Sequence, residues 1–411
     1  MTIVIAGAGI GGLTAALSLH AVGFRNISVY DRVDALRPLG VGINLLPHAV
    51  RELTELGLGS RLAALGTAPE TLAYYNRHGQ LIWSEPRGVA AGYRWPQLSV
   101  HRGALQMELL AAVRERLGRG TVRLGHRLVD ADANGGARFT TAEGTVDVAA
   151  ELVIGADGIH SALRRRRRPD EGPPVSNGLV LWRGTARAPG FLDGRTMIMA
   201  GDAEQKFVAY PLGDRVNVIA ERRTAGSAEH EANWNRAVAA GPIVELFGQW
   251  QFPWLDVPGL IGACDEILEY PMVDRDPLSR WTFGRTTLLG DAAHPMYPNG
   301  SNGASQAVLD ARTLAFHLAT AQSVEAALTA YENDRRPATT ALVRSNRSQG
   351  PEQVMVLAHE RAPEGFDDIH DVIGAEELGA IATAYKRAAG FHPDELNTRA
   401  SLTPPNIREQ L

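Results

Sequence analysis

The stretch Thr2-Ile3-Val4-Ile5-Ala6-Gly7-Ala8-Gly9-Ile10-Gly11-Gly12 decides the fold of this chain. It predicts a buried strand, a Gly-x-Gly-x-x-Gly turn and the start of an apolar helix. Gly7 suits the tight turn, Gly9 lets backbone N–H groups approach a pyrophosphate, and Gly12 lets the helix pack closely on the strand. A second strand over 27–30 ends in Asp31, where a carboxylate can bind ribose hydroxyls. The pattern therefore predicts a Rossmann-type dinucleotide site.

The composition is that of an ordinary folded protein. The chain has 411 residues, is 45% hydrophobic and carries a formal charge of −5, so two domains fit and nothing marks a nucleic-acid binder. The basic run 164–168 is short, and we expect most of it to be a solvated face. Cys264 is the single cysteine, which excludes an intrachain disulfide, fits a reducing compartment and predicts a buried core thiol in a cytoplasmic protein.

Two kinds of segment are absent from the sequence. No basic residue precedes the N-terminal apolar stretch and glycines interrupt it, which argues against a signal peptide. Nowhere does the chain have the ~18 uninterrupted apolar residues that a membrane span needs. No cluster of His, Cys or Asp has metal-ligand spacing, so we expect no metal site.

The middle of the chain changes character. From about 177 to 275 the pattern is rich in strands, with candidates at 179–182, 207–210 and 216–219, and then returns to alternating strands and helices. We predict an α/β (overall α+β) protein, in which a Rossmann-type domain carries an inserted, mainly antiparallel β-sheet that binds the substrate. The predicted boundaries are 1–71, 98–176 and 276–345 for the cofactor domain, 72–97 and 177–275 for the substrate domain, and 346–411 for a C-terminal helical tail.

Two further motifs make the prediction more specific. They are Gly155-Ala156-Asp157-Gly158-Ile159-His160-Ser161-Ala162-Leu163-Arg164, and Gly290-Asp291-Ala292-Ala293-His294 followed by Pro298-Asn299-Gly300-Ser301-Asn302-Gly303. With the N-terminal glycines, and in this order, they resemble the three signatures of the single-component FAD-dependent aromatic hydroxylases. The resemblance implies that the first domain binds FAD noncovalently.

The resemblance also implies roles for individual residues. Asp291 would hold the ribityl chain of FAD, and the loop 298–302 would aim the N-terminus of a long helix at the flavin pyrimidine edge. Asp157 fits a purely structural role equally well, and Asp291 on its own could be a turn residue. The implied cofactor-binding residues are Gly7, Gly9, Gly12, Asp31, Arg37, Gly42, Arg102, Asp157, Asp291, Gly300, Ser301 and Asn302.

The reaction of that family is the hydroxylation of an aromatic ring. NADH or NADPH would reduce FAD transiently, O2 would form a flavin C4a-hydroperoxide, and the ring would be hydroxylated, with decarboxylation where the attacked carbon bears a carboxylate. The candidates for catalysis are Pro298, Gly300 and Tyr210, and the candidates for the substrate pocket are Trp182, Arg183, Phe207, Tyr210 and Pro298. Trp182 and Arg183 must lie on opposite faces of one strand, so only one can face the substrate. Tyr210 suits proton transfer or the core, and His294 suits loop packing.

Several segments, among them 83–89 and 270–278, resemble the phenazine-modifying hydroxylases of this family. A flat N-heteroaromatic substrate such as a phenazine carboxylate is therefore expected, although the resemblance weakens over 185–265 and is lost in the tail. The alternatives are a non-oxygenating FAD dehydrogenase or oxidase, and an FAD-containing protein that sequesters small molecules. A halogenase is excluded because the chain has no Trp-x-Trp-x-Ile-Pro segment. The expected partners are a small aromatic molecule and O2, without nucleic acid or membrane, in a monomer or homodimer.

Overall fold

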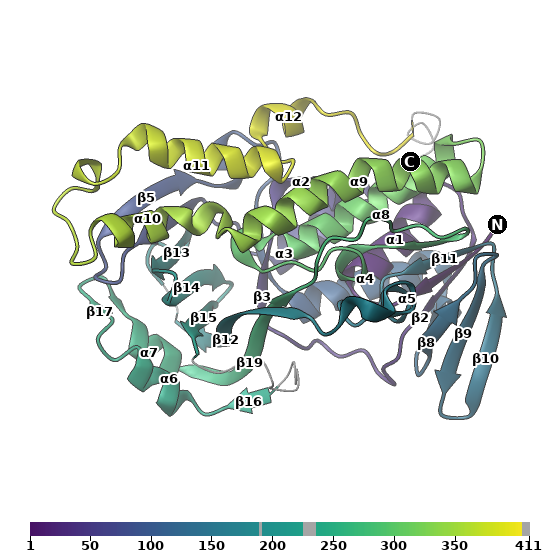
Figure 1. Cartoon of the computed structure of the whole chain (residues 1–411), viewed down its shortest axis with the longest axis horizontal. Coiled ribbons are helices and arrows are strands. Elements are labelled where there is room, and N and C mark those ends of the chain that lie inside the picture. The colour runs from purple at the N-terminus through teal and green to yellow at the C-terminus, as the bar shows by residue number, and fades with distance from the viewer. Residues whose placement is uncertain (189–190, 225–235, 405–411) are drawn as a thin grey trace.

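The first layer is a parallel sheet at the N-terminal end of the chain (Figure 1). The computed structural model describes residues 1–188, 191–224 and 236–404. The sheet has the strand order β20-β11-β1-β2-β7, and every neighbouring pair is parallel. Its strands are β1 (Thr2–Ala6), β2 (Asn26–Tyr30), β7 (Val122–Arg123), β11 (Leu152–Gly155) and β20 (Thr286–Leu288). The Ile-rich and Val-rich runs in these strands are buried on both faces, as parallel sheets require.

Helices and a small antiparallel sheet cover the parallel sheet. The helices are α1 (Ile10–Ala21), α2 (Pro47–Glu55), α3 (Gly59–Leu65), α4 (Arg102–Leu117), α5 (Ala162–Arg167), α8 (Gly303–Thr320) and α9 (Val324–Arg347). The small sheet consists of β8 (Arg127–Ala131), β9 (Gly136–Thr141) and β10 (Gly144–Ala149). Phe139 packs from this sheet into the core that α1 and β1 share, so all these elements form one body. The predicted helix from about 303 is confirmed as α8.

The second layer is an eight-stranded sheet with the order β16-β19-β12-β15-β14-β13-β4-β5. All its neighbouring pairs are antiparallel except β13 with β4. Its strands are β4 (Thr71–Tyr75), β5 (Leu81–Pro86), β12 (Val175–Arg187), β13 (Thr196–Gly201), β14 (Gln205–Leu212), β15 (Arg215–Arg223), β16 (Arg236–Val238) and β19 (Cys264–Asp274). The predicted strand-rich middle segment is confirmed. The domain boundaries themselves remain a proposal.

The two faces of this sheet have different neighbours. One face packs on α6 (Ala240–Leu246), α7 (Val257–Gly262) and the short pair β17 (Gln251–Phe252) and β18 (Leu255–Asp256). The opposite face meets the first layer, and the antiparallel pair β3 (Gly42–Leu45) and β6 (Leu98–His101) lies between the two. We call this second face the inner face. Successive side chains along each strand therefore point alternately into the core beneath α6 and α7 and toward the cofactor domain.

The chain enters and leaves the inserted segment at one place. Val175 at the start of β12 pairs with Asp274 at the end of β19. Next to this pair, Glu171 accepts hydrogen bonds from Arg275 Nη1 at 3.1 Å and from Arg164 Nε at 2.9 Å. Arg164 is 1% exposed, so a buried ion cluster ties the two crossings together. Most of the basic run is exposed, as expected, and Arg164, the last residue of the second motif, is buried.

The C-terminal segment forms α10 (Gln353–Arg361), α11 (Ala375–Ala388) and α12 (Pro393–Thr398). These helices lie across both layers (Figure 1). α10 packs on the inner face through Val354 and Met355, and Tyr385 of α11 packs near α2 with Phe391. The predicted α/β fold class, with a Rossmann-type domain and an antiparallel second domain, is confirmed. Within the described ranges, no helix combines the length and the apolar character needed to cross a membrane.

Candidate cofactor and substrate site

The three sequence motifs meet at the carboxyl edge of the parallel sheet. The N–H of Gly7 donates to Tyr30 O at 2.7 Å, and that of Leu289 donates to Gly155 O at 2.9 Å. The N–H of Ala156 donates to Ala6 O at 2.7 Å, so the loops after β1, β2, β11 and β20 lie side by side. Open α/β sheets bind ligands at this edge, because loops from several strands converge there.

The glycines of the first loop have two different roles. Gly7 and Gly12 allow close packing of the backbone, and Gly9 leaves space for a ligand. Gly7 has a φ of +111°, and a Cβ on it would lie 2.2 Å from Ala156 O. A Cβ on Gly12 would lie 1.9 Å from Gly7 O, so both positions are closed to any side chain. A Cβ on Gly9 would meet no atom within 4 Å. Since no side chain caps α1, its first N–H groups face this open space, which suits a pyrophosphate.

Asp31 organises the first two loops. Its Oδ2 accepts the Ala8 N–H at 2.7 Å and its Oδ1 accepts the Val33 N–H at 3.1 Å. On the other side, Gln106 Nε2 donates to Ala8 O at 2.7 Å. Sequence reasoning missed Gln106, although a glutamine on the buried side of the apolar helix α4 was a visible signal. The half-buried Asp31 carboxylate keeps acceptor capacity for a hydroxyl pair.

Arg102 interacts electrostatically with Asp291 in the site. Asp291 has exposed surface, yet protein atoms surround its carboxylate, and this partial desolvation raises its pKa. Electrostatic interactions with His294 and Arg102 lower the same pKa. Gly103 lets the loop 37–41 pack on the start of α4, since a Cβ on it would lie 2.3 Å from Pro38 C. Arg37, on the same loop, is exposed.

A buried network centred on Asp310 holds the Asp291 loop in place. Asp310, on α8, accepts hydrogen bonds from Gly290 N at 2.9 Å, from His294 Nε2 at 2.5 Å and from Arg335 Nε at 2.8 Å. Burial alone would raise its pKa, but the charges of His294 and Arg335 lower the pKa to about 2. His294 therefore packs the loop, which is the role that the sequence analysis gave it. Sequence reasoning missed Asp310, an acid on a helix whose other buried residues are mostly apolar.

The loop before α8 has a strained backbone that a tyrosine supports. Gly300 has a φ of +70° and Ser301 a φ of +57°, a region that side chains rarely adopt. Tyr385 Oη donates to Asn299 O at 3.1 Å and accepts from Asn302 Nδ2 at 2.9 Å. No side chain caps α8, so its first N–H groups point past this loop. Pro298, at the tip, is exposed. The sequence carried no signal for Tyr385.

The inner face of the second sheet presents Arg183 to the cofactor domain. Arg183 Nη2 donates to Gly42 O at 2.8 Å, and Gly42 N donates to Asn217 Oδ1 at 2.7 Å. The Arg183 guanidinium lies 5.8 Å from the centroid of the Tyr270 ring. Tyr210 is on the same face, where burial raises its pKa to about 12 although Arg183 lowers it. A phenol that keeps its proton is a hydrogen-bond donor and not a base, which disfavours proton abstraction by Tyr210.

Two predicted pocket residues lie on the wrong face. Trp182 Nε1 donates to Glu269 Oε2 at 2.9 Å, and its ring packs on the core beneath α6 and α7. Phe207 is fully buried in that core, with its ring centroid 6.3 Å from that of Phe247. The alternation along β12 and β14 turns both side chains away from the cofactor domain. Neither belongs to the candidate pocket.

Asp157 acts within its own loop. Its Oδ2 accepts the Ala162 N–H at 2.8 Å at the start of α5. Burial raises its pKa, and hydrogen bonds from Ser161 and Ala162 lower it. Arg164 then donates to Ala293 O at 2.8 Å and binds this loop to the Asp291 loop. These contacts give the second motif a structural role, and direct cofactor contact by Asp157 stays a prediction.

Together these residues fit a dinucleotide with a flavin. The open side of Gly9, the uncapped α1, Asp291 and the uncapped α8 all lie at the carboxyl edge of the sheet. Among the described residues, no group of three His, Cys, Asp or Glu side chains could hold a metal ion.

Comparison with known proteins gives the same assignment. The family described as FAD binding domain matches residues 1–177 and 264–346. The chain is 48% identical to phenazine 1,6-dicarboxylic acid hydroxylase PhzS of Lysobacter antibioticus over 84% of this chain and 89% of that protein. It is 31% identical to aurachin C monooxygenase/isomerase of Stigmatella aurantiaca over 81% and 84%. The crystal structure of Klebsiella pneumoniae HpxO with FAD and uric acid superposes with a TM-score of 0.75 at 26% identity, covering 99% of this chain and 98% of that one.

Proposed function

We propose, from the premise that this chain belongs to the FAD binding domain family, that it hydroxylates a phenazine carboxylate or a closely related N-heteroaromatic acid. The chain is an FAD-dependent aromatic monooxygenase that uses NAD(P)H. The narrower substrate is supported by the 48% identity to a phenazine dicarboxylic acid hydroxylase. That identity extends over 84% of this chain and 89% of the relative.

The proposal depends on one observation: the inner face of the second sheet lies next to the residues that would hold the cofactor. Arg183 reaches from β12 to the carbonyl of Gly42, on the cofactor side, at 2.8 Å. A ring held between the two layers would therefore lie against the cofactor. When bound, FAD supplies electron transfer from NAD(P)H and the activation of O2.

The protein's own contribution is positioning and charge. Asp291 and Arg102 would hold the cofactor, with the N–H groups of α1 and α8 at its negatively charged parts. Arg183 and the protonated Tyr210 supply positive charge and donors on the substrate side. The sheet and the C-terminal helices exclude water from the space between them.

A turnover experiment with the FAD-loaded protein tests the proposal. NADH or NADPH oxidation is followed with phenazine-1-carboxylate, phenazine-1,6-dicarboxylate and monocyclic hydroxybenzoates, and product masses are measured. We expect phenazine acids to accelerate oxidation and to gain one oxygen, with or without loss of carbon dioxide. NAD(P)H oxidation without an oxygenated product would instead indicate a dehydrogenase or oxidase, and tight binding without turnover a sequestering protein.

If only the monocyclic phenols were hydroxylated, the phenazine assignment would fail and the monooxygenase assignment would stand.

The same proposal includes O2 as co-substrate and a cytoplasmic location. The single Cys264 supports this location, because a protein with one thiol needs no oxidising compartment. Gel filtration of the holoprotein distinguishes a monomer from a homodimer.

A further inference from the structure

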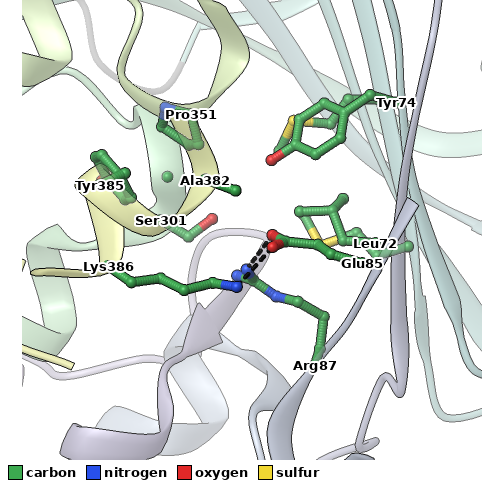
Figure 2. A pocket seen from close by; sticks show the side chains of 12 residues that line it. Leu72, Tyr74, Glu85, Arg87, Ser301, Pro351, Ala382, Tyr385 and Lys386 are labelled. Carbon is green, nitrogen blue, oxygen red and sulfur yellow. Dashed lines mark hydrogen bonds and ion pairs between the residues drawn. The ribbon is translucent and has the colours of Figure 1, made fainter. Parts of the chain in front are cut away.

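The C-terminal helix α11 brings a lysine into a recess beside the strained loop. Lys386 Nζ donates to Glu85 Oε2 at 2.6 Å, and Arg87 Nη1 donates to Glu85 Oε1 at 2.9 Å. Figure 2 shows the two cations converging on the Glu85 carboxylate, with Ser301 and Tyr385 on the same side as Lys386. We call the space that these side chains border the Arg87–Lys386 recess. No sequence pattern linked α11 to strand β5, from which Glu85 comes.

The recess has a polar end and an apolar wall. Met197, Met199 and Leu72 of the inner face line it, together with Gly300 and Ser301 of the loop before α8. Its volume is about 10 Å³, roughly the space that one water molecule needs. A carboxylate is larger than this space, so it would enter only if the bordering side chains moved apart, and its ring would lie outside, along the methionines.

The charges at the polar end do not balance. The side chains of Arg87 and Glu85 are 11% and 5% exposed, and that of Lys386 is 18% exposed. Two cations thus share one carboxylate in a largely buried place, where an uncompensated charge is costly. Glu352, another acid on this side of the sheet, shares Lys206 with Glu221, so that neighbouring group has two carboxylates for one cation.

Hydrogen-bond donors are also left over. Arg87 Nε donates to Gln97 Oε1 at 2.9 Å and Nη1 donates to Glu85, but Nη2 has no partner among the described residues. Lys386 Nζ gives one of its three hydrogens to Glu85. A guanidinium and an ammonium that retain free N–H groups beside an apolar wall suit a carboxylate on an aromatic ring.

We propose that Arg87 and Lys386 bind the carboxylate of the aromatic substrate, so that the C-terminal helix carries a determinant of substrate specificity. This inference rests on the proposed function. Glu85 keeps the two cations apart and in place, and it also weakens their attraction for an anion. Removal of a cation and removal of Glu85 should therefore change carboxylate affinity in opposite directions.

Binding to the FAD-loaded protein tests the proposal, with the flavin absorbance as the signal and phenazine-1-carboxylate and uncharged phenazine as the probes. Lys386→Met keeps most of the side-chain length and removes the charge. We expect it to raise the Kd of the carboxylate at least about tenfold, the usual effect of losing a charged hydrogen bond, and to leave the Kd of phenazine within about twofold. Lys386→Arg should restore carboxylate binding, and Glu85→Gln should tighten it.

Arg387→Met is the matched control, because it removes the same charge from the next, exposed position of α11. It should change neither Kd. Equal changes for both probes in Lys386→Met, or no change for the carboxylate, would overturn the inference and leave Lys386 as a structural link between α11 and β5. If the unmodified protein bound and hydroxylated only uncarboxylated rings, the proposed substrate would fail instead, and that result is visible before any variant is made.

Discussion

The Asp310 network predicts a large loss of stability from a change of one atom. Asp310→Asn keeps the shape of the side chain but removes the negative charge that His294 and Arg335 share. Asp310 is 0% exposed, and Arg335 is also buried, so water cannot replace the lost partner. Breaking a buried ion pair from one side costs about 3–5 kcal/mol, because a charge remains without compensation.

The pKa of Asp310 gives an independent estimate. In the folded protein it is lowered from 3.8 to about 2, which corresponds to roughly 2 kcal/mol of stabilisation. Since the folded pKa lies below the unfolded one, this stabilisation is complete above about pH 4 and is lost as the pH falls toward 2. The two estimates bracket an expected loss of about 2–5 kcal/mol for Asp310→Asn at neutral pH.

Urea unfolding of the two proteins, followed by tryptophan fluorescence, measures this loss. Trp281 is a local reporter, because its ring centroid lies 5.3 Å from that of His294. The matched control is Asp334→Asn, since Asp334 also accepts a hydrogen bond from a histidine of α8, His317, at 2.7 Å. Asp334 is 59% exposed, so its loss should cost less than about 1 kcal/mol.

Equal, small losses in Asp310→Asn and Asp334→Asn would refute this reasoning.

Three further predictions follow from the site and the second sheet. Asp291→Ala should raise the Kd of FAD about tenfold or more, because a hydrogen bond to a carboxylate contributes about 1.5–3 kcal/mol, while the melting temperature of the apoprotein should hardly change. Phe207→Ala should lower the free energy of unfolding by about 3–5 kcal/mol, because Phe207 is fully buried. The KM for the aromatic substrate should change by less than twofold. A change in KM without a loss of stability would show that Phe207 contacts the substrate after all. Burial, and then Asp265, raise the pKa of Cys264 to about 12, so iodoacetamide at pH 8 should alkylate the folded protein about a thousandfold more slowly than the urea-unfolded protein.

The sequence predicted the parts of the molecule that depend on local patterns. The glycine turn, the buried strands and the loops before Asp291 and Gly303 follow from residue spacing, and the parallel sheet brings them to one edge. Alternation also put Trp182 and Arg183 on opposite faces. It could not say which face meets the cofactor domain, because that depends on where α6 and α7 pack.

The parts that sequence reasoning missed depend on contacts between distant segments. Lys386 and Glu85 are 301 positions apart, and Tyr385 reaches Asn299 over 86 positions. The sequence placed Arg164 in the second motif, but the carbonyl groups of Ala293 and Asp276 that bind it come from distant segments that no local pattern indicates. The periodicity of apolar residues in a helix predicts which side of the helix is buried, but it does not predict which other segment packs against that side.

The pairing of Val175 with Asp274 has a consequence for engineering. A segment that leaves and re-enters its host at adjacent points can be exchanged between relatives without stretching the host, as inserted domains are. A graft of this kind would also have to carry residues 71–86, because β4 pairs with β13 and β5 completes the same sheet. Two splice segments would then move the second sheet as one unit, while the cofactor domain and the two cations Arg87 and Lys386 stay with the host.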